Sequence, residues 1–139
     1  VVIRNPKAVR PWQHVIEPLF GYLELGIKLN SDSIKYAQAY NFGPNLDDTL
    51  SVEDMVIKSI NCWESGTYNV EVNFNNPHEA GLLKLDISKA TTELNWKPVL
   101  NVQSALELTI NWYKNYYNNT TATELMESDI KYYQSKINE

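Results

Sequence analysis

The sequence is poor in the residues on which most metal centres and nucleotide-binding loops depend. It contains one cysteine, two histidines and five glycines among 139 residues. The lone cysteine, Cys62, cannot form an internal disulfide, and its apolar helical surroundings predict a small buried hydrophobic side chain. No cysteine–histidine spacing indicates a metal site. No apolar run is long enough to span a membrane and no secretory signal is recognisable, so we expect a cytoplasmic protein without a membrane partner.

Complete catalytic motifs are missing as well. The glycines never fall in the patterns GxGxxG or GxxxxGK, which excludes a glycine-rich loop around a phosphate, and no GxSxG elbow is present. With only His14 and His78 available, a nucleophile and its base cannot be paired. We therefore assign no catalytic, cofactor-binding or metal-binding residue. The sequence supports ligand binding better than turnover.

Positive charge is also scarce. The 12 lysines and arginines are outnumbered by 17 aspartates and glutamates, which gives a formal net charge of -5. This balance argues against a nucleic-acid partner, although a local arginine can still hold a phosphate. The hydrophobic content of 43% is enough for one domain with a buried core. We expect the four tryptophans in that core or in a cleft wall.

The apolar periodicity predicts a mixed α/β (α+β) fold with small sheets and packed helices, not a regular βαβ array. We expect strands at residues 1–4, 36–42, 68–74 and 82–85, and a short extended segment at 10–14. We expect helices at 15–29, 52–63 and 88–95, one capped by Asn101, and a last one after Thr121. The inner face of the first helix is predicted to carry Ile16, Leu19, Phe20, Leu23 and Ile27.

The residue spacing also predicts two capped helix starts and one boundary between units. Ser51 with Asp54, and Thr121 with Glu124, have the spacing of a capping box at a helix start. The run Asn118-Asn119-Thr120 indicates a boundary. We therefore divide the chain into a unit of residues 1–118 and a helical tail of residues 119–139. A thin apolar stripe of Met126, Ile130, Tyr133 and Ile137 lets this tail dock but not stand alone.

The segment from Arg10 to Val15 is the best candidate for a binding wall. It places an arginine, two aromatic or heteroaromatic rings and an amide next to a proline, just before an apolar helix. Arg4 and Arg10 flank a turn at Asn5-Pro6, and a guanidinium group can fork onto a phosphate or stack on a flat base. We interpret His14 as a hydrogen-bonded structural group, not a general base.

A loop at residues 75–79 provides a second candidate. His78 and Glu79 follow two asparagines and a proline, and loops on rigid scaffolds often carry binding residues. A carboxylate at this place suits the two hydroxyl donors of a ribose. A solvated loop without function is the alternative.

Several segments resemble the C-terminal part of the CDP-glucose 4,6-dehydratase family, within the extended short-chain dehydrogenase/reductase superfamily. The unbroken Arg10-Pro11-Trp12-Gln13-His14-Val15, with Arg4-Asn5-Pro6 before it, is the most specific of them. The others are Tyr40-Asn41-Phe42-Gly43-Pro44, His78-Glu79-Ala80, residues 83–90 and Leu94-Asn95-Trp96-Lys97-Pro98. The resemblance covers residues 1–118.

The resemblance implies a C-terminal substrate-binding domain separated from its Rossmann domain. The family converts CDP-D-glucose to CDP-4-dehydro-6-deoxy-D-glucose and water, in deoxysugar and O-antigen (lipopolysaccharide) biosynthesis. It binds NAD in the N-terminal Rossmann domain, which also carries the catalytic residues. The implied partners are a CDP-sugar, the chain's own Rossmann domain and, in the intact lyase, further copies of itself. This chain alone is expected to be inactive.

The resemblance also implies roles for four residues. Arg10 falls where relatives place an arginine on the diphosphate, and Arg4 falls where they place a ring against the base. An arginine plane can stack on cytosine in the same way. Glu79, beside His78, falls where relatives have a polar group near the ribose. Asn76 replaces a second diphosphate arginine, so Arg10 is expected to bear more of the phosphate, and Pro11 stands where relatives often have aspartate.

Two other functions remain open at this point. A fragment of another nucleotide-sugar epimerase, dehydratase or decarboxylase would share the superfamily segments, although the Arg-Asn-Pro and Arg-Pro-Trp pair argues against it. A non-catalytic interaction module would instead use its exposed aromatic residues as a partner surface. In either enzyme fragment, apolar surface that the Rossmann domain would cover is expected to be exposed and to promote self-association.

Overall fold

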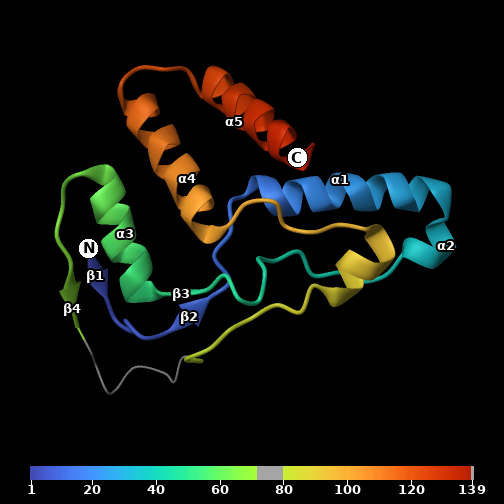
Figure 1. The fold of residues 1–139 in the computed structure, drawn as a ribbon, viewed down its shortest axis with the longest axis horizontal. Helices are drawn as coiled ribbons and strands as arrows, with labels where there is room; N and C mark the ends of the chain where they lie inside the picture. Colours follow the sequence, from blue (N-terminus) through green and yellow to red (C-terminus); the bar gives the residue numbers. More distant parts are fainter. Residues whose placement is uncertain (72–79, 139) are drawn as a thin grey trace.

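A computed structural model describes residues 1–71 and 80–138, which form six helices and two small sheets, the sheets lying at one edge of the molecule (Figure 1). The helices are α1 (Ile16–Ser31), α2 (Ser33–Tyr36), α3 (Val52–Trp63), the π-helix η1 (Ala90–Leu94), α4 (Val102–Tyr117) and α5 (Ala122–Ile137). The strands are β1 (Val2–Ile3), β2 (Val9–Arg10), β3 (Leu50–Ser51) and β4 (Asn69–Val70). The mixed α and β class with small sheets is therefore confirmed. The division at residue 118 stays a prediction.

Each of the two sheets has two short strands. β1 pairs in parallel with β4, and β2 pairs antiparallel with β3, with Arg10 opposite Leu50. The strand expected at residues 82–85 is reduced to a single parallel bridge between Val9 and Leu82. The Val9 N–H donates to the carbonyl of Gly81 over 2.8 Å, and its carbonyl accepts from the N–H of Leu83 over 3.2 Å. β2 therefore lies between β3 and the segment around Leu82.

The strand predicted at residues 36–42 is wrong. α1 continues to Ser31, and Asp32 then caps the short helix α2 by accepting a hydrogen bond from the Lys35 N–H. The backbone beyond Tyr36 runs without regular structure as far as Phe42. Tyr36 and Phe42 are buried through their rings, which pack in the core beside Trp96. Their β-forming tendency therefore reflects side-chain burial and not strand pairing.

The helix starts follow the predicted caps. The Ser51 hydroxyl accepts from the Asp54 N–H while the Asp54 carboxylate accepts from the Ser51 N–H. Thr121 and Glu124 form the same reciprocal pair at α5. Asn101 caps α4 through its side-chain oxygen. Side-chain caps of this kind satisfy backbone donors that have no partner within the helix.

The inner face of α1 agrees only in part with the predicted one, because Ile16 and Phe20 pack against the core but the other three residues do not. Leu19, Leu23 and Ile27 are 50%, 67% and 64% exposed, whereas Glu17 and Gly21 are buried. α1 is rotated about its axis relative to the predicted orientation because Gly21 lets the Phe42 ring approach the helix backbone. A larger residue at position 21 would hold the ring and the helix apart. An apolar stripe of α1 and its N-cap residue therefore faces outward, made of Val15, Leu19, Tyr22, Leu23 and Ile27.

The core consists of two adjoining clusters. One joins Tyr36, Phe42, Ala90, Leu94 and Trp96, and the other joins Leu100, Ala105 and Tyr133; Phe20 packs against both. The placement of Trp96 in the core is confirmed, and the other three tryptophans are half-buried. Cys62 is a half-buried free thiol, less buried than the sequence predicted. No described helix has the length and apolar character needed to cross a membrane.

Candidate functional site

The Arg10 side chain extends from β2 and is held by hydrogen bonds to β2 itself and to residue 80. Its Nη1 donates to the carbonyl of Val9 over 3.0 Å and to the carbonyl of Ala80 over 2.8 Å. The side chain is half-buried. Its guanidinium group is thus positioned next to residue 80, which directly follows His78 and Glu79 in the sequence.

The three residues after Pro11 form hydrogen bonds that fix the segment from Arg10 to Val15, the candidate binding wall. Trp12 Nε1 donates to the carbonyl of Leu50 over 3.0 Å, and Gln13 Nε2 donates to the carbonyl of Phe42 over 2.9 Å. His14 Nδ1 accepts from the N–H of Ile16. The interpretation of His14 as a hydrogen-bonded structural group agrees with this bond. Burial lowers the pKa of His14, so its neutral form is favoured.

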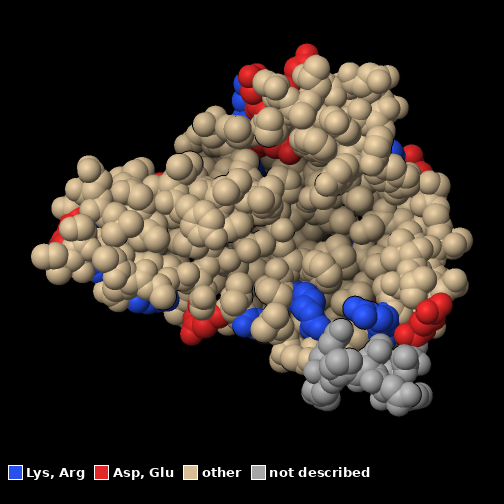
Figure 2. Space-filling model, turned by 180° about the vertical axis from the view of Figure 1, so that it is seen from behind, with Lys and Arg blue, Asp and Glu red and all other residues tan. Residues whose placement is uncertain are grey.

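The structure tests none of the four predicted site residues, Arg4, Arg10, His78 and Glu79, as a ligand contact. Arg4 is exposed directly after β1. His78 and Glu79 lie outside the described residues, as does Asn76. Figure 2 shows a largely uncharged face on which lysine and arginine side chains gather along its lower edge. The predicted grouping of Arg4, Arg10, His78 and Glu79 stays a prediction.

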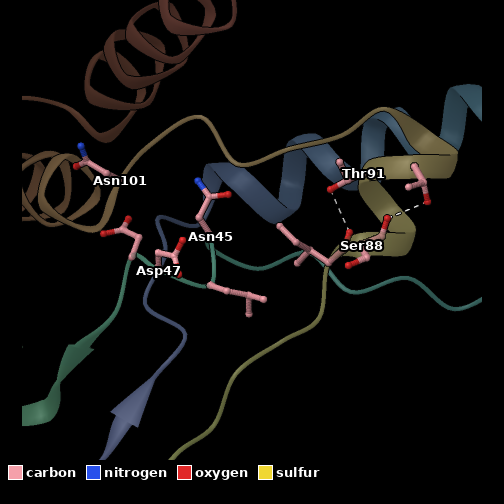
Figure 3. A pocket seen from close by; sticks show the side chains of 9 residues that line it. Asn45, Asp47, Ser88, Thr91 and Asn101 are labelled. Carbon is pink, nitrogen blue, oxygen red and sulfur yellow. Dashed lines mark hydrogen bonds between the residues drawn. The ribbon is translucent and has the colours of Figure 1, made fainter.

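A hollow of about 760 Å³ is present in the described part of the chain (Figure 3). It lies between the loop after Pro44, the start of η1 and the start of α4, and is lined by Asn45, Leu46, Asp47, Asp48, Ile87, Ser88, Thr91, Thr92 and Asn101. Amides, hydroxyls and carboxylates of this kind can bind a hydroxyl-rich ligand.

Most of these polar groups already serve the fold. The Asp48 carboxylate accepts from the N–H of Val102, and the Asn101 side chain accepts from the N–H of Ser104. The Thr91 hydroxyl donates to the carbonyl of Ile87. Among residues 1–71 and 80–138, no group of three or more histidine, cysteine or acidic side chains is placed to hold a metal ion. We therefore interpret this cavity as a set of helix caps around a solvent-filled hollow.

Sequence reasoning missed the most buried charged residue, Glu17. Its side chain is 1% exposed in α1. Oε1 accepts from the N–H groups of Val99 and Leu100 over 2.8 and 2.6 Å, and Oε2 accepts from the Tyr133 hydroxyl over 2.7 Å. Burial and this carboxylate raise the pKa of Tyr133. The available signal was helical spacing, because position 17 shares a face with Phe20.

These observations define a mixed α and β unit in which the Arg10 side chain, on β2, is held by the carbonyl groups of Val9 and Ala80. A CDP-glucose 4,6-dehydratase of Salmonella typhimurium strain LT2 is 40% identical to this chain over 114 residues, which is 82% of the chain and 32% of that relative. The resemblance found in the sequence is thus confirmed: the chain is related to CDP-glucose 4,6-dehydratase over part of its length. It spans about a third of the length of that relative. No family model matches the chain.

Proposed function

We propose that this chain is the nucleotide-sugar-binding part of a CDP-glucose 4,6-dehydratase. The observation that carries the proposal is the position of Arg10, together with the relationship to a protein of that name. Arg10 lies on β2 and is oriented by two carbonyl groups, so its guanidinium group needs little further ordering to bind a diphosphate. Arg4, His78 and Glu79 are proposed to contact the base and the ribose.

We further propose that NAD and the catalytic residues belong to a separate part of the enzyme. The five glycines of this chain occur singly, and none forms a loop that can surround a dinucleotide phosphate. The residues present therefore do not fit NAD. In the whole enzyme this chain would position the sugar nucleotide, and the NAD-binding part would carry out the dehydration of CDP-D-glucose, in a cytoplasmic oligomer.

The outward stripe of α1 is the proposed contact with that NAD-binding part. Leu23 and Ile27 are both more than 60% exposed on a helix whose opposite face is already packed. Exposed apolar stripes of this length are unusual on a monomeric protein surface and favour a covering partner. Without that partner, the stripe should cause the chain to self-associate.

Replacing Leu23 with glutamate is expected to reduce self-association of the chain at least about tenfold, because a charge would enter an apolar contact. Sedimentation velocity over a range of concentrations measures the effect. The thermal unfolding midpoint should not change, since Leu23 is exposed. Leu82→Glu, at an equally exposed leucine beside β2, is the matched control and should self-associate as the wild type does. A wild-type chain that stays monomeric at all concentrations contradicts the proposal.

Replacing Arg10 with alanine is expected to weaken CDP binding by about 1.5–3 kcal/mol, because a charge-assisted hydrogen bond is lost. Titration calorimetry with the whole enzyme measures the change. Arg10→Lys keeps the charge but loses the forked geometry, so we expect an intermediate affinity. Lys131→Ala, an exposed cation on α5, is the control and should bind CDP normally.

Two results would argue against this function. Unchanged CDP affinity in Arg10→Ala would remove Arg10 from the diphosphate site. A thermal-shift screen of the chain with CDP, UDP and dTDP distinguishes the remaining alternatives. Stabilisation by CDP supports the proposal, stabilisation by UDP or dTDP alone supports a different nucleotide-sugar enzyme, and no stabilisation supports an interaction module.

A further inference from the structure

A second cavity, of about 580 Å³, lies where the start of α1 meets α4 and α5. This volume is in the range of sites for small organic ligands. Its walls are mostly apolar, and it is lined by Gln13, His14, Val15, Ile16, Leu19, Thr109, Trp112, Tyr113, Met126, Asp129 and Ile130. No lysine or arginine is among these lining residues, so an anionic ligand such as a phosphate would not be favoured.

Two polar side chains face one another in this apolar cavity. His14 Nε2 lies 3.9 Å from Asp129 Oδ2, and the two side chains are only 9% and 16% exposed. The N–H of Ile16 donates to His14 Nδ1, so the proton of the neutral ring is assigned to Nε2. The cavity thus contains an N–H donor and a carboxylate acceptor that are too far apart for a direct hydrogen bond.

A hydroxyl group is complementary to this pair. The oxygen of a hydroxyl group can accept from His14 Nε2–H while the hydroxyl donates its proton to Asp129 Oδ2. A bridging group is expected where two polar atoms, such as His14 Nε2 and Asp129 Oδ2, lie more than about 3.5 Å apart. An ether or a plain hydrocarbon cannot make both bonds.

The side of the cavity that α4 forms favours a ligand whose hydroxyl group is attached to a flat aromatic ring. Trp112 lines the cavity, and its ring stacks on Tyr116 with centroids 5.2 Å apart and planes inclined by 16°. Neighbouring rings restrict the motion of the indole, which makes it a preformed surface for an aromatic ligand.

We propose that this cavity is a binding site for a small, uncharged aromatic alcohol, whose hydroxyl bridges His14 and Asp129 and whose ring lies against Trp112. Gln13, His14 and Val15 belong to the same segment as Arg10, but the contacts proposed here, with His14, Asp129 and Trp112, involve none of the side chains proposed to hold the nucleotide sugar, which are Arg4, Arg10, His78 and Glu79. Binding in this cavity is therefore a function additional to the proposed one, and either can fail without the other.

Naphthol and its methyl ether provide the test on the wild-type chain, because they share the ring and differ in the donor proton. Quenching of tryptophan fluorescence, checked by titration calorimetry, should show naphthol binding at least about tenfold tighter than the ether. Equal affinities, or no binding of either probe, would overturn the proposal. This comparison requires no variant and so does not depend on a variant that folds.

Substitutions then locate the two contacts. Asp129→Ala should weaken naphthol binding about tenfold and leave the ether unaffected, whereas Trp112→Leu should weaken both probes. Glu127→Ala, at an exposed acid on the same helix, is the matched control and should bind naphthol as the wild type does. Wild-type naphthol affinity in Asp129→Ala would contradict the bridging hydroxyl.

Discussion

Replacing Glu17 with alanine is expected to lower the free energy of unfolding by about 3–5 kcal/mol, since it removes the buried acceptor of three hydrogen bonds. The N–H groups of Val99 and Leu100 would lose their partner inside the fold. The Tyr133 hydroxyl would lose its partner at the same time. Urea unfolding followed by circular dichroism measures the loss.

Glu17→Gln is the matched control for that experiment. Its amide oxygen can accept from the two backbone N–H groups, and its amide nitrogen can donate to the Tyr133 hydroxyl, which then acts as an acceptor. We expect a loss of only about 1 kcal/mol. Tyr133→Phe should cost about 1–2 kcal/mol, and less in a Glu17→Ala background. A loss below about 1 kcal/mol in Glu17→Ala would mean that these bonds contribute little.

Replacing Gly21 with alanine is expected to destabilise the chain by about 2 kcal/mol, although alanine is the better helix former. A Cβ atom at position 21 would lie 2.4 Å from Phe42 Cδ1, well inside van der Waals contact. The Phe42 ring cannot retreat, because it also packs edge-on against Trp96 with centroids 5.0 Å apart. Overpacking of this kind costs about 1–3 kcal/mol. Thermal and urea unfolding measure the effect.

Gly26→Ala, on the same helix, is the control that measures the effect of helix propensity without a clash against Phe42. Nothing lies within 4 Å of a Cβ atom at that position, and Gly26 is exposed. Its substitution should therefore stabilise the chain by about 0.5–1 kcal/mol, as expected from helix propensity alone. Phe42→Leu should recover part of the stability in the Gly21→Ala chain. Equal effects of the two glycine substitutions would show that the contact with Phe42 does not restrict position 21.

The sequence predicted local structure, such as helix caps, better than it predicted the tertiary packing of the helices. The capping boxes at Ser51 and Thr121 depend on residues three positions apart, so their chemistry is visible in the sequence. The outward face of α1 was not predictable from periodicity, because Gly21 and Glu17 determine its rotation through contacts with distant segments. The strand predicted at residues 36–42 failed for the same reason: its aromatic residues were buried by helices and not by a neighbouring strand.

The candidate site shows the same division. The motif from Arg10 to Val15 is the most specific part of the resemblance to CDP-glucose 4,6-dehydratase, which is confirmed, whereas the binding role of this segment stays a prediction. The tautomer of His14 and its distance to Asp129 depend on the docking of α5, which no local pattern specifies. Glu17 belongs to this second group, because its partners lie 82, 83 and 116 positions away in the sequence.

The side-chain bonds of the binding wall also constrain how it forms during folding. Gln13, Trp12 and Arg10 each bond to backbone groups that are 29, 38 and 70 positions away. The loop-closure entropy for such contacts must be overcome before the bonds contribute, so the wall cannot exist in a short peptide of residues 10–15. Its geometry is acquired together with the fold as a whole. Any ligand that binds this wall is therefore coupled thermodynamically to global unfolding, and its affinity should decline as the chain loses stability.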